Sequence, residues 1–217
     1  MREDQDLTKL QAPVIVHGDD RRESLGLVHV YTGDGKGKTT AALGLAFRAL
    51  GDGLRVCMIQ FLKACETGEL ITASKLSNMT IVQAGVAQEG EMQKKLHEYE
   101  ERLKKNAQGE NGTKFAFMAD FDESTACRRG FDLAKKVALS GEYDLLILDE
   151  INCVLNKGLI PIAEALALMQ NHGHTELVFT GWGASEEIQQ AADYVSFIKR
   201  VKHPYERGVK ARRGIEY

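Results

Sequence analysis

The 217-residue chain lacks the features that mark membrane, secreted and nucleic-acid-binding proteins. It has no apolar run long enough to span a bilayer, and its first four residues, Met-Arg-Glu-Asp, do not resemble a signal peptide. Its formal net charge is −3, whereas general nucleic-acid binding requires a basic face. We therefore expect a cytoplasmic protein that binds neither nucleic acid nor a membrane.

Cysteine is also scarce, and the four cysteines lie far apart with no Cys-x-x-Cys pair. Such thiols are expected to be buried or free in a reducing compartment. The six histidines show no metal-site spacing, so neither residue type points to a disulfide framework or a metal centre. A hydrophobic content of 43% and a charged content of 27% are ordinary for one soluble globular domain.

Glycine, by contrast, is concentrated in a loop between a strand-like run at residues 28–32 and a helix-like run at residues 38–50. The loop ends in Gly-Lys-Thr at residues 37–39, which is the ending of a phosphate-binding P-loop. The usual pattern has another glycine five positions before Gly37, where this chain has Thr32. The sequence therefore predicts a nucleotide-phosphate loop with unusual internal spacing.

The residue types in this loop suit a triphosphate. Glycine lets backbone N–H groups approach phosphate oxygens, and the helix start adds donors and the positive end of a dipole. Lys38 is predicted to place a positive charge on the phosphates, and the Thr39 hydroxyl to bind Mg²⁺. A glycine-rich turn with a surface lysine is the alternative, which the flanking strand and helix disfavour. The loop residues predicted to bind ATP are Gly33, Asp34, Gly35, Lys36, Gly37, Lys38, Thr39 and Thr40.

An apolar run that ends in two acids, at residues 143–150, provides the second half of the predicted site. Such a run is typical of a buried parallel strand, and α/β sheets bind ligands at the carboxyl ends of their strands. Asp149 is predicted to face Mg²⁺ directly or through water, and Glu150 to join the metal shell or hold a water. An exposed acidic turn is the alternative, and the loop around Lys38 argues against it.

Strand-like and helix-like runs alternate along the chain, which predicts an α/β fold with a parallel sheet covered on both faces. Strands are predicted at residues 28–32, 55–61, 79–83, 145–149, 176–180 and 194–198. Helices are predicted at residues 38–50, 68–76, 91–106, 122–140, 161–171 and 185–192. The polar residues 1–24 are predicted to form an N-terminal arm, and residues 25–217 a single domain.

Two further segments have open interpretations. Phe115 and Phe117 follow a segment dense in Lys and Glu, and core packing is the default for them, with a lid over an apolar ligand as the alternative. The basic C-terminal residues 201–217 either fray or wrap back toward an anionic ligand.

The loop at residues 32–40 resembles that of the ATP:corrinoid adenosyltransferases of the cobalamin pathway, including its short glycine spacing. Further segments resemble the family in the same order along the chain, and together the resemblance covers residues 25–217. These segments are residues 60–63, 68–69, 148–150, 180–181, 202–203, 208–211 and 214–217. The loop spacing and the C-terminal segments together make the resemblance specific.

The resemblance implies a P-loop NTPase fold of the RecA-like type, with a mostly parallel central sheet flanked by helices. It implies that Co(I) of a reduced corrinoid attacks the 5′ carbon of ATP and expels triphosphate, so that no side-chain general base is required. ATP is expected to bind in the orientation opposite to that of ordinary P-loop enzymes. The implied catalytic residues are Lys38, Thr39 and Glu150, and the implied Mg²⁺ (or Mn²⁺) ligands are Thr39, Asp149 and Glu150.

The resemblance also implies a homodimer, an electron-donor flavoprotein as partner, and Arg48 near the phosphates. Phe115, Phe117 and Trp182 are the candidate corrinoid contacts. Many members of the family have arginine where this chain has Trp182, and an indole supplies no charge but can stack on a base or a corrin ring.

Two other functions stay open from the sequence. One is a P-loop ATPase or kinase that cleaves the terminal phosphate of ATP. The other is a non-catalytic module that binds ATP or a corrinoid, which the replacement at Trp182 keeps in consideration. The released product distinguishes the three, because an adenosyltransferase releases triphosphate only when a reduced corrinoid is present.

Overall fold

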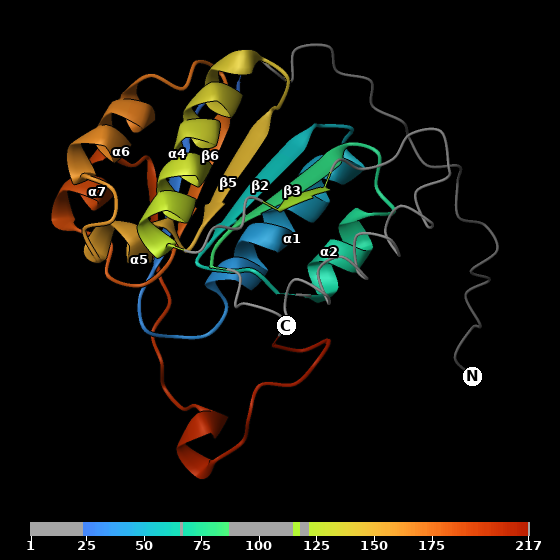
Figure 1. The fold of residues 1–217 in the computed structure, drawn as a ribbon, viewed down its shortest axis with the longest axis vertical. Coiled ribbons are helices and arrows are strands. Elements are labelled where there is room, and N and C mark those ends of the chain that lie inside the picture. Colours follow the sequence, from blue (N-terminus) through green and yellow to red (C-terminus); the bar gives the residue numbers. More distant parts are fainter. Residues whose placement is uncertain (1–23, 66, 87–114, 118–121, 217) are drawn as a thin grey trace, which may run out of the picture.

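The computed structural model describes residues 24–65, 67–86, 115–117 and 122–216, which form an α/β fold (Figure 1). Its strands are β1 (Val28–Thr32), β2 (Val56–Phe61), β3 (Met79–Ala84), β4 (Phe115–Phe117), β5 (Leu145–Asp149), β6 (Glu176–Thr180) and β7 (Tyr194–Phe197). The strands form one seven-stranded sheet in the order β4-β3-β2-β5-β6-β1-β7. All neighbouring strands are parallel, which confirms the predicted sheet.

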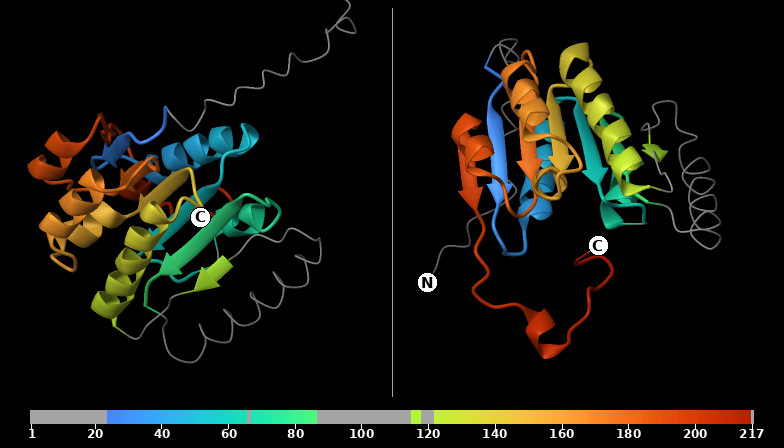
Figure 2. Two further views of the ribbon diagram at one scale, coloured as in Figure 1. Left: turned by 90° about the horizontal axis from the view of Figure 1, so that it is seen from above. Right: turned by 60° about the vertical axis from the view of Figure 1, so that its left-hand side comes forward.

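The helices are α1 (Lys38–Gly51), α2 (Gly68–Ala73), α4 (Glu123–Ser140), α5 (Ile151–Asn156), α6 (Ile162–Gln170), α7 (Glu186–Ala191) and the 3₁₀ helix η3 (Pro204–Arg207). Helices α1 and α2 cover one face of the sheet, and α4 to α7 cover the other (Figures 1 and 2). Along β2, Val56 and Met58 pack into the first layer, whereas Cys57, Ile59 and Phe61 pack into the second. Both faces of the central strands are therefore buried, as expected for a parallel sheet.

Local signals in the sequence account for the best-defined helix ends. Asp122 precedes α4, and its side chain accepts a hydrogen bond from the Thr125 amide at 2.7 Å, which satisfies a free donor of the first turn. Gly141 ends α4 with a φ of 66°, in the left-handed region that glycine adopts without strain. On α1, the small side chains of Ala42, Ala46 and Ala49 face the sheet and let the helix lie close to it.

All six predicted strands and five of the six predicted helices are confirmed, with shifts of a few residues at their ends. The sequence reading missed β4, α5 and η3, each of six residues or fewer. The predicted helix at residues 91–106 and the predicted arm, apart from Ser24, lie outside the described residues. Within the described part of the chain, no helix has the length and apolar character that crossing a membrane requires.

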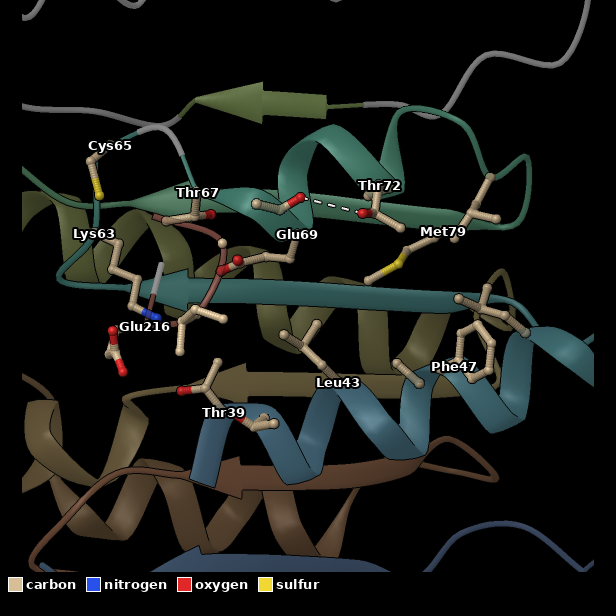
Figure 3. A pocket seen from close by; sticks show the side chains of 18 residues that line it. Thr39, Leu43, Phe47, Lys63, Cys65, Thr67, Glu69, Thr72, Met79 and Glu216 are labelled. Atoms are coloured by element: carbon tan, nitrogen blue, oxygen red, sulfur yellow. Dashed lines mark hydrogen bonds between the residues drawn. The ribbon is translucent and has the colours of Figure 1, made fainter. Parts of the chain in front are cut away.

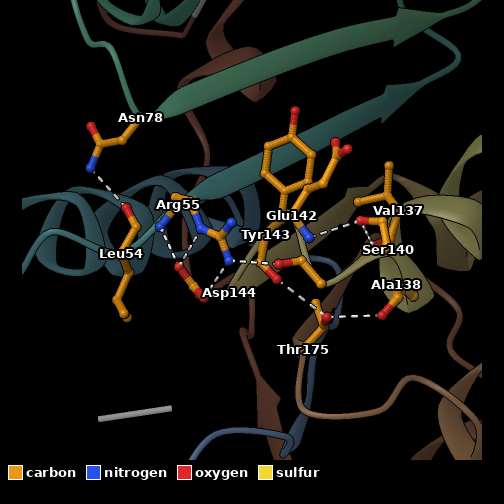
Figure 4. A network of polar contacts seen from close by, with 11 residues as sticks. Leu54, Arg55, Asn78, Val137, Ala138, Ser140, Glu142, Tyr143, Asp144 and Thr175 are labelled. Carbon is orange, nitrogen blue, oxygen red and sulfur yellow. Dashed lines mark hydrogen bonds and ion pairs between the residues drawn. The ribbon is translucent and has the colours of Figure 1, made fainter. Parts of the chain in front are cut away.

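A polar network fixes the sheet at the edge opposite the glycine-rich loop (Figure 4). The buried carboxylate of Asp144 accepts hydrogen bonds from the backbone and guanidinium of Arg55, at 2.8 to 3.1 Å. The guanidinium also donates to the Gly141 carbonyl at 2.7 Å, and the Asn78 side chain donates to the Leu54 carbonyl at 2.8 Å. These bonds tie together the starts of β2, β3 and β5, so the network has a structural role.

Candidate functional site

The glycine-rich loop lies at the carboxyl end of β1 and leads directly into α1, as the sequence predicted. Gly33 has a φ of 103°, and a Cβ atom at this position would lie 2.4 Å from the Ile198 carbonyl oxygen. The Gly35 amide donates a hydrogen bond to that same oxygen at 2.8 Å. Glycine is therefore required at these positions because the chain that follows β7 packs directly against the loop.

Asp34, the acidic residue of the loop, is exposed and accepts a hydrogen bond from the Arg200 amide at 3.0 Å. This hydrogen bond lowers the pKa of the Asp34 carboxyl below its usual value. Together with the contact at Ile198, it places residues 198–200 along the flank of the loop that faces β7.

Lys38 folds over the loop that precedes it. Its ammonium donates hydrogen bonds to the carbonyl oxygens of Gly33 and Gly35, each at 2.8 Å. The positive charge is therefore held against the loop by two neutral acceptors. The phosphate contact predicted for Lys38 stays a prediction.

Asp149 is the centre of the site, at the end of β5 and 0% exposed. One carboxylate oxygen accepts hydrogen bonds from the hydroxyls of Thr39 at 2.8 Å and Thr180 at 2.7 Å. The other accepts from the ammonium of Lys63 at 2.7 Å. A buried carboxylate is tolerated when it is paired and hydrogen-bonded in this way, and these bonds join α1, β6 and the residues after β2 to one point.

Lys63 is a site residue that the sequence reading recognised as part of a motif but gave no role. Burial alone would lower its pKa, but the adjacent Asp149 carboxylate outweighs burial and raises the pKa above its usual value. The residue before it, Leu62, has a φ of 60°, which is uncommon for a non-glycine residue and marks a sharp turn at the end of β2. A lysine two residues after a buried strand was the available signal, because the carboxyl ends of parallel strands share one edge of the sheet.

Glu150 follows Asp149 and precedes α5, in an unusual backbone conformation. Its φ of 64° lies in the left-handed region, and its amide donates to the Thr180 hydroxyl at 3.0 Å. Its carboxylate accepts a hydrogen bond from the Cys153 thiol at 2.9 Å. Burial and this hydrogen bond raise the pKa of Cys153 to about 12, so the thiol stays protonated and acts as the donor.

The structure brings Thr39 and Asp149 together, and these two residues carry the oxygen ligands that Mg²⁺ prefers. Among the described residues, no group of three or more His, Cys, Asp and Glu side chains could hold a metal ion by itself.

The remaining predicted residues lie farther from this cluster. Arg48 is exposed in the last turn of α1, ten residues after Lys38, which corresponds to about 15 Å along the helix axis. Trp182 is 56% exposed beyond the end of β6. Phe115 and Phe117 belong to the edge strand β4, and their side chains lie outside what the structure describes. The roles predicted for these four residues stay predictions.

A cleft of about 490 Å³ opens beside Thr39, between α1 and α2 (Figure 3). The C-terminal residues 214–216 line part of it, because the chain after β7 passes below the carboxyl ends of the strands and returns toward α1 and α2 (Figure 2). Sequence reasoning missed this cleft, since it depends on the packing of two helices and a tail that are distant in the sequence.

The comparisons with known proteins agree with the geometry of the loop and the acidic strand end. The model of a family described as ATP:corrinoid adenosyltransferase BtuR/CobO/CobP matches residues 24–217. The corrinoid adenosyltransferase of Escherichia coli strain K12 is 30% identical over 219 residues, covering 96% of this chain and 92% of that protein. Corrinoid adenosyltransferase CobA of Salmonella typhimurium is 30% identical over 206 residues, covering 90% and 88%. The corrinoid adenosyltransferase of Pseudomonas aeruginosa is 29% identical over 198 residues, covering 90% and 86%.

Proposed function

The chain belongs to the ATP:corrinoid adenosyltransferase family, and we propose that it transfers the 5′-deoxyadenosyl group of ATP to Co(I) of a reduced corrinoid. The observation that carries this proposal is the joining of the loop to the buried acid: Thr39, the residue after the loop lysine, donates to Asp149 at 2.8 Å. This contact supports the proposal, because it joins a loop of the P-loop type to an acidic strand end, and a triphosphate would bind between such elements.

In the proposed reaction, the electron pair of Co(I) forms a cobalt–carbon bond with the 5′ carbon of ATP. The bond between that carbon and its phosphate oxygen breaks, and the electrons leave with triphosphate. The loop amides and the Lys38 ammonium hold the triphosphate and stabilise the negative charge that develops on it. The site residues described above need not act as a general base, because the nucleophile carries no proton.

We propose that Mg²⁺ (or Mn²⁺) accompanies the triphosphate, held by the Thr39 hydroxyl and the Asp149 carboxylate, with Glu150 supporting it. The donor set fits, because hydroxyl and carboxylate oxygens lie side by side here. The ion would supply further neutralisation of the phosphate charge. Lys63 already neutralises part of the Asp149 carboxylate.

The resemblance to the family supports four further proposals: a homodimer, a flavoprotein that donates electrons to the corrinoid, a cytoplasmic location, and an N-terminal arm at residues 1–24 ahead of one domain. It also supports phosphate contacts by Arg48 and corrinoid contacts by Phe115, Phe117 and Trp182. Trp182 has an exposed indole, which is free to stack on a planar ligand.

The test is an anaerobic incubation of the protein with ATP, Mg²⁺ and chemically reduced cobalamin, followed by the ultraviolet–visible spectrum and analysis of the phosphate product. We expect the spectrum of an adenosylated corrinoid and one triphosphate per adenosyl group. Release of ADP and phosphate without corrinoid would instead identify a P-loop ATPase or kinase. Binding of both ligands without any product would identify a non-catalytic module.

A further inference from the structure

The chain after β7 carries a charge opposite to that of the rest of the protein. Residues 199–216 contain seven lysines and arginines and two glutamates, which gives them a formal charge of +5. The whole chain has a formal charge of −3, so the residues outside this segment together carry −8. A basic segment on an otherwise acidic protein indicates that the segment interacts with an anion.

Both ends of this segment lie at the glycine-rich loop. At its start, residues 198–200 are hydrogen-bonded to residues 34–35 of the loop, at 2.8 and 3.0 Å. At its end, hydrogen bonds from Arg212 and the positive charge of Lys36 in the loop lower the pKa of Glu216. Between these ends the segment passes below the carboxyl ends of the strands, as Figure 2 shows, so it borders the approach to the loop.

Four cations of the segment are exposed and have no ion-pair partner among the residues that the structure describes. Arg200 and Arg212 instead pair with acidic residues, at 3.9 and 3.1 Å. A cation without a neighbouring carboxylate keeps its full effect on anions that approach from solution. The four unpaired cations are Lys199, Lys202, Arg207 and Lys210.

The middle of the segment is held by short-range bonds. From residue 201 to residue 212, the hydrogen bonds within the described part of the chain join positions at most five apart, such as the bond from the Val209 amide to the Pro204 carbonyl at 3.3 Å. The side chains of Lys202 and Lys210 therefore have no role in holding the sheet and its helices together, and their charges can be removed without disturbing the fold.

We propose that residues 199–213 form an electrostatic collar that draws ATP to the glycine-rich loop and sets the rate at which ATP associates. This proposal rests on the proposed function, because it takes ATP as the ligand of the loop. The negative charge of the remaining protein repels a triphosphate, whereas the collar places a positive potential where the triphosphate enters. Steering of this kind raises association rates about 10- to 10³-fold and weakens as salt screens the charges.

The first experiment measures the binding of ATP with Mg²⁺ by stopped-flow fluorescence, with Trp182, the only tryptophan of the chain, as the reporter. At an ionic strength of about 0.01 M, where the Debye length is about 30 Å, the double variant Lys202→Gln/Lys210→Gln should bind ATP about threefold more slowly than the wild type. At about 1 M, where the Debye length is about 3 Å, the two rates should be equal. The dissociation rate should not change, since charges at the rim of a site act mainly on association.

Three comparisons separate the collar from a general effect of charge. Lys202→Arg/Lys210→Arg keeps both charges and should bind ATP at the wild-type rate. Lys75→Gln/Lys136→Gln removes two exposed lysines that have no ion-pair partner among the described residues, and it should leave the rate nearly unchanged. These two lysines precede Asn78 and Gly141, which lie at the edge of the sheet opposite the loop. ADP has less negative charge than ATP, so the collar variant should slow its association less.

The second experiment uses the adenosylation assay at saturating corrinoid and low salt. A slower association with unchanged dissociation weakens ATP binding by the same factor, so Lys202→Gln/Lys210→Gln should lower kcat/KM for ATP about threefold and leave kcat unchanged. Melting curves of the variants should match that of the wild type.

Equal losses in the Lys202→Gln/Lys210→Gln and Lys75→Gln/Lys136→Gln variants would overturn the proposal. A loss that persists at high salt, or that lies in the dissociation rate, would overturn it as well, because it would indicate a direct contact with bound ATP. Adenosylation by the wild type is a separate measurement. A protein that binds ATP with the expected rates but forms no adenosylated corrinoid refutes the proposed function alone, and one that adenosylates with rates insensitive to these charges refutes the collar alone.

Discussion

Replacement of Lys63 by methionine tests the ion pair at the centre of the site. The substitution keeps much of the side-chain length but removes the ammonium that lies 2.7 Å from the buried Asp149 carboxylate. Removing one partner of a buried ion pair typically costs ~3–5 kcal/mol. Lys63 is 25% exposed, and Asp149 keeps the hydroxyl donors of Thr39 and Thr180, so we expect a loss of ~2–3 kcal/mol in the free energy of unfolding.

Urea denaturation at pH 7 measures this loss, with Lys157→Met as the matched control. Lys157 pairs with Glu123 on the surface, where the two side chains are 48% and 40% exposed, so its replacement should cost ~0.5 kcal/mol or less. In a double-mutant cycle with Asp149→Asn, the Lys63→Met effect should shrink by at least ~1 kcal/mol. Equal losses in Lys63→Met and Lys157→Met, or strict additivity in the cycle, would refute the reasoning.

The pH dependence gives a further check on the same pair. The pKa of Lys63 is raised in the folded protein above its ordinary value of 10.5. A basic group whose pKa is higher in the folded than in the unfolded protein stabilises the fold when it is protonated. This contribution is complete at pH values below the pKa of the unfolded state, and it is lost as the pH rises through the pKa of the folded state. The stability difference between wild type and Lys63→Met should therefore be constant up to about pH 9 and shrink above pH 10.5.

Three other predictions follow from individual contacts. Lys38→Ala should lower kcat/KM for adenosylation by about 10²- to 10³-fold, because the ammonium is proposed to stabilise the triphosphate. The Tm should change little, because the ammonium is bound to carbonyl oxygens of the loop and to no charged group among the described residues. Near wild-type turnover would refute the assignment of the loop. Burial would raise the pKa of Glu176, but its hydrogen bonds, the largest effect being that of His29, lower the pKa below 4.5. Glu176→Gln should therefore lower the free energy of unfolding by ~1 kcal/mol at pH 6. In urea titrations, the difference from wild type should fade as the pH drops below 4.5. Mass spectrometry after iodoacetamide treatment at pH 8 should find Cys65 modified and Cys153 intact, since Cys153 is buried with a pKa of about 12; fast modification of Cys153 would contradict its bond to Glu150.

The parts of the site that the sequence predicted are those encoded by contiguous residues. Residues 33–38 carry the glycines, the loop lysine and the helix start in one segment, and Asp149 ends a strand whose five residues are all buried. Periodicity and residue type are enough for such elements, since each depends on its nearest neighbours in the chain.

The parts that were missed depend on strand order and helix packing. Lys63 reaches Asp149 because β2 lies beside β5, a neighbour relation that no local pattern encodes. Strand β4 has three residues and is defined by its pairing with β3, from Ile81 opposite Phe115. Helix α5 begins directly after Asp149 and Glu150. The backbone of Glu150, which precedes the helix, has the left-handed conformation, and this conformation is uncommon for a residue other than glycine.

The two lysines at the site differ in how firmly their charges are held, and this difference assigns them different tasks. Lys38 donates to neutral carbonyl oxygens, bonds that contribute ~1 kcal/mol each, so its ammonium can move to phosphate oxygens at little loss. Lys63 is bound to a carboxylate with no exposed surface, and moving it would leave that charge uncompensated. ATP binding should therefore draw on Lys38, while Lys63 keeps Asp149 oriented toward Thr39 and thus holds the strand end in register with the loop.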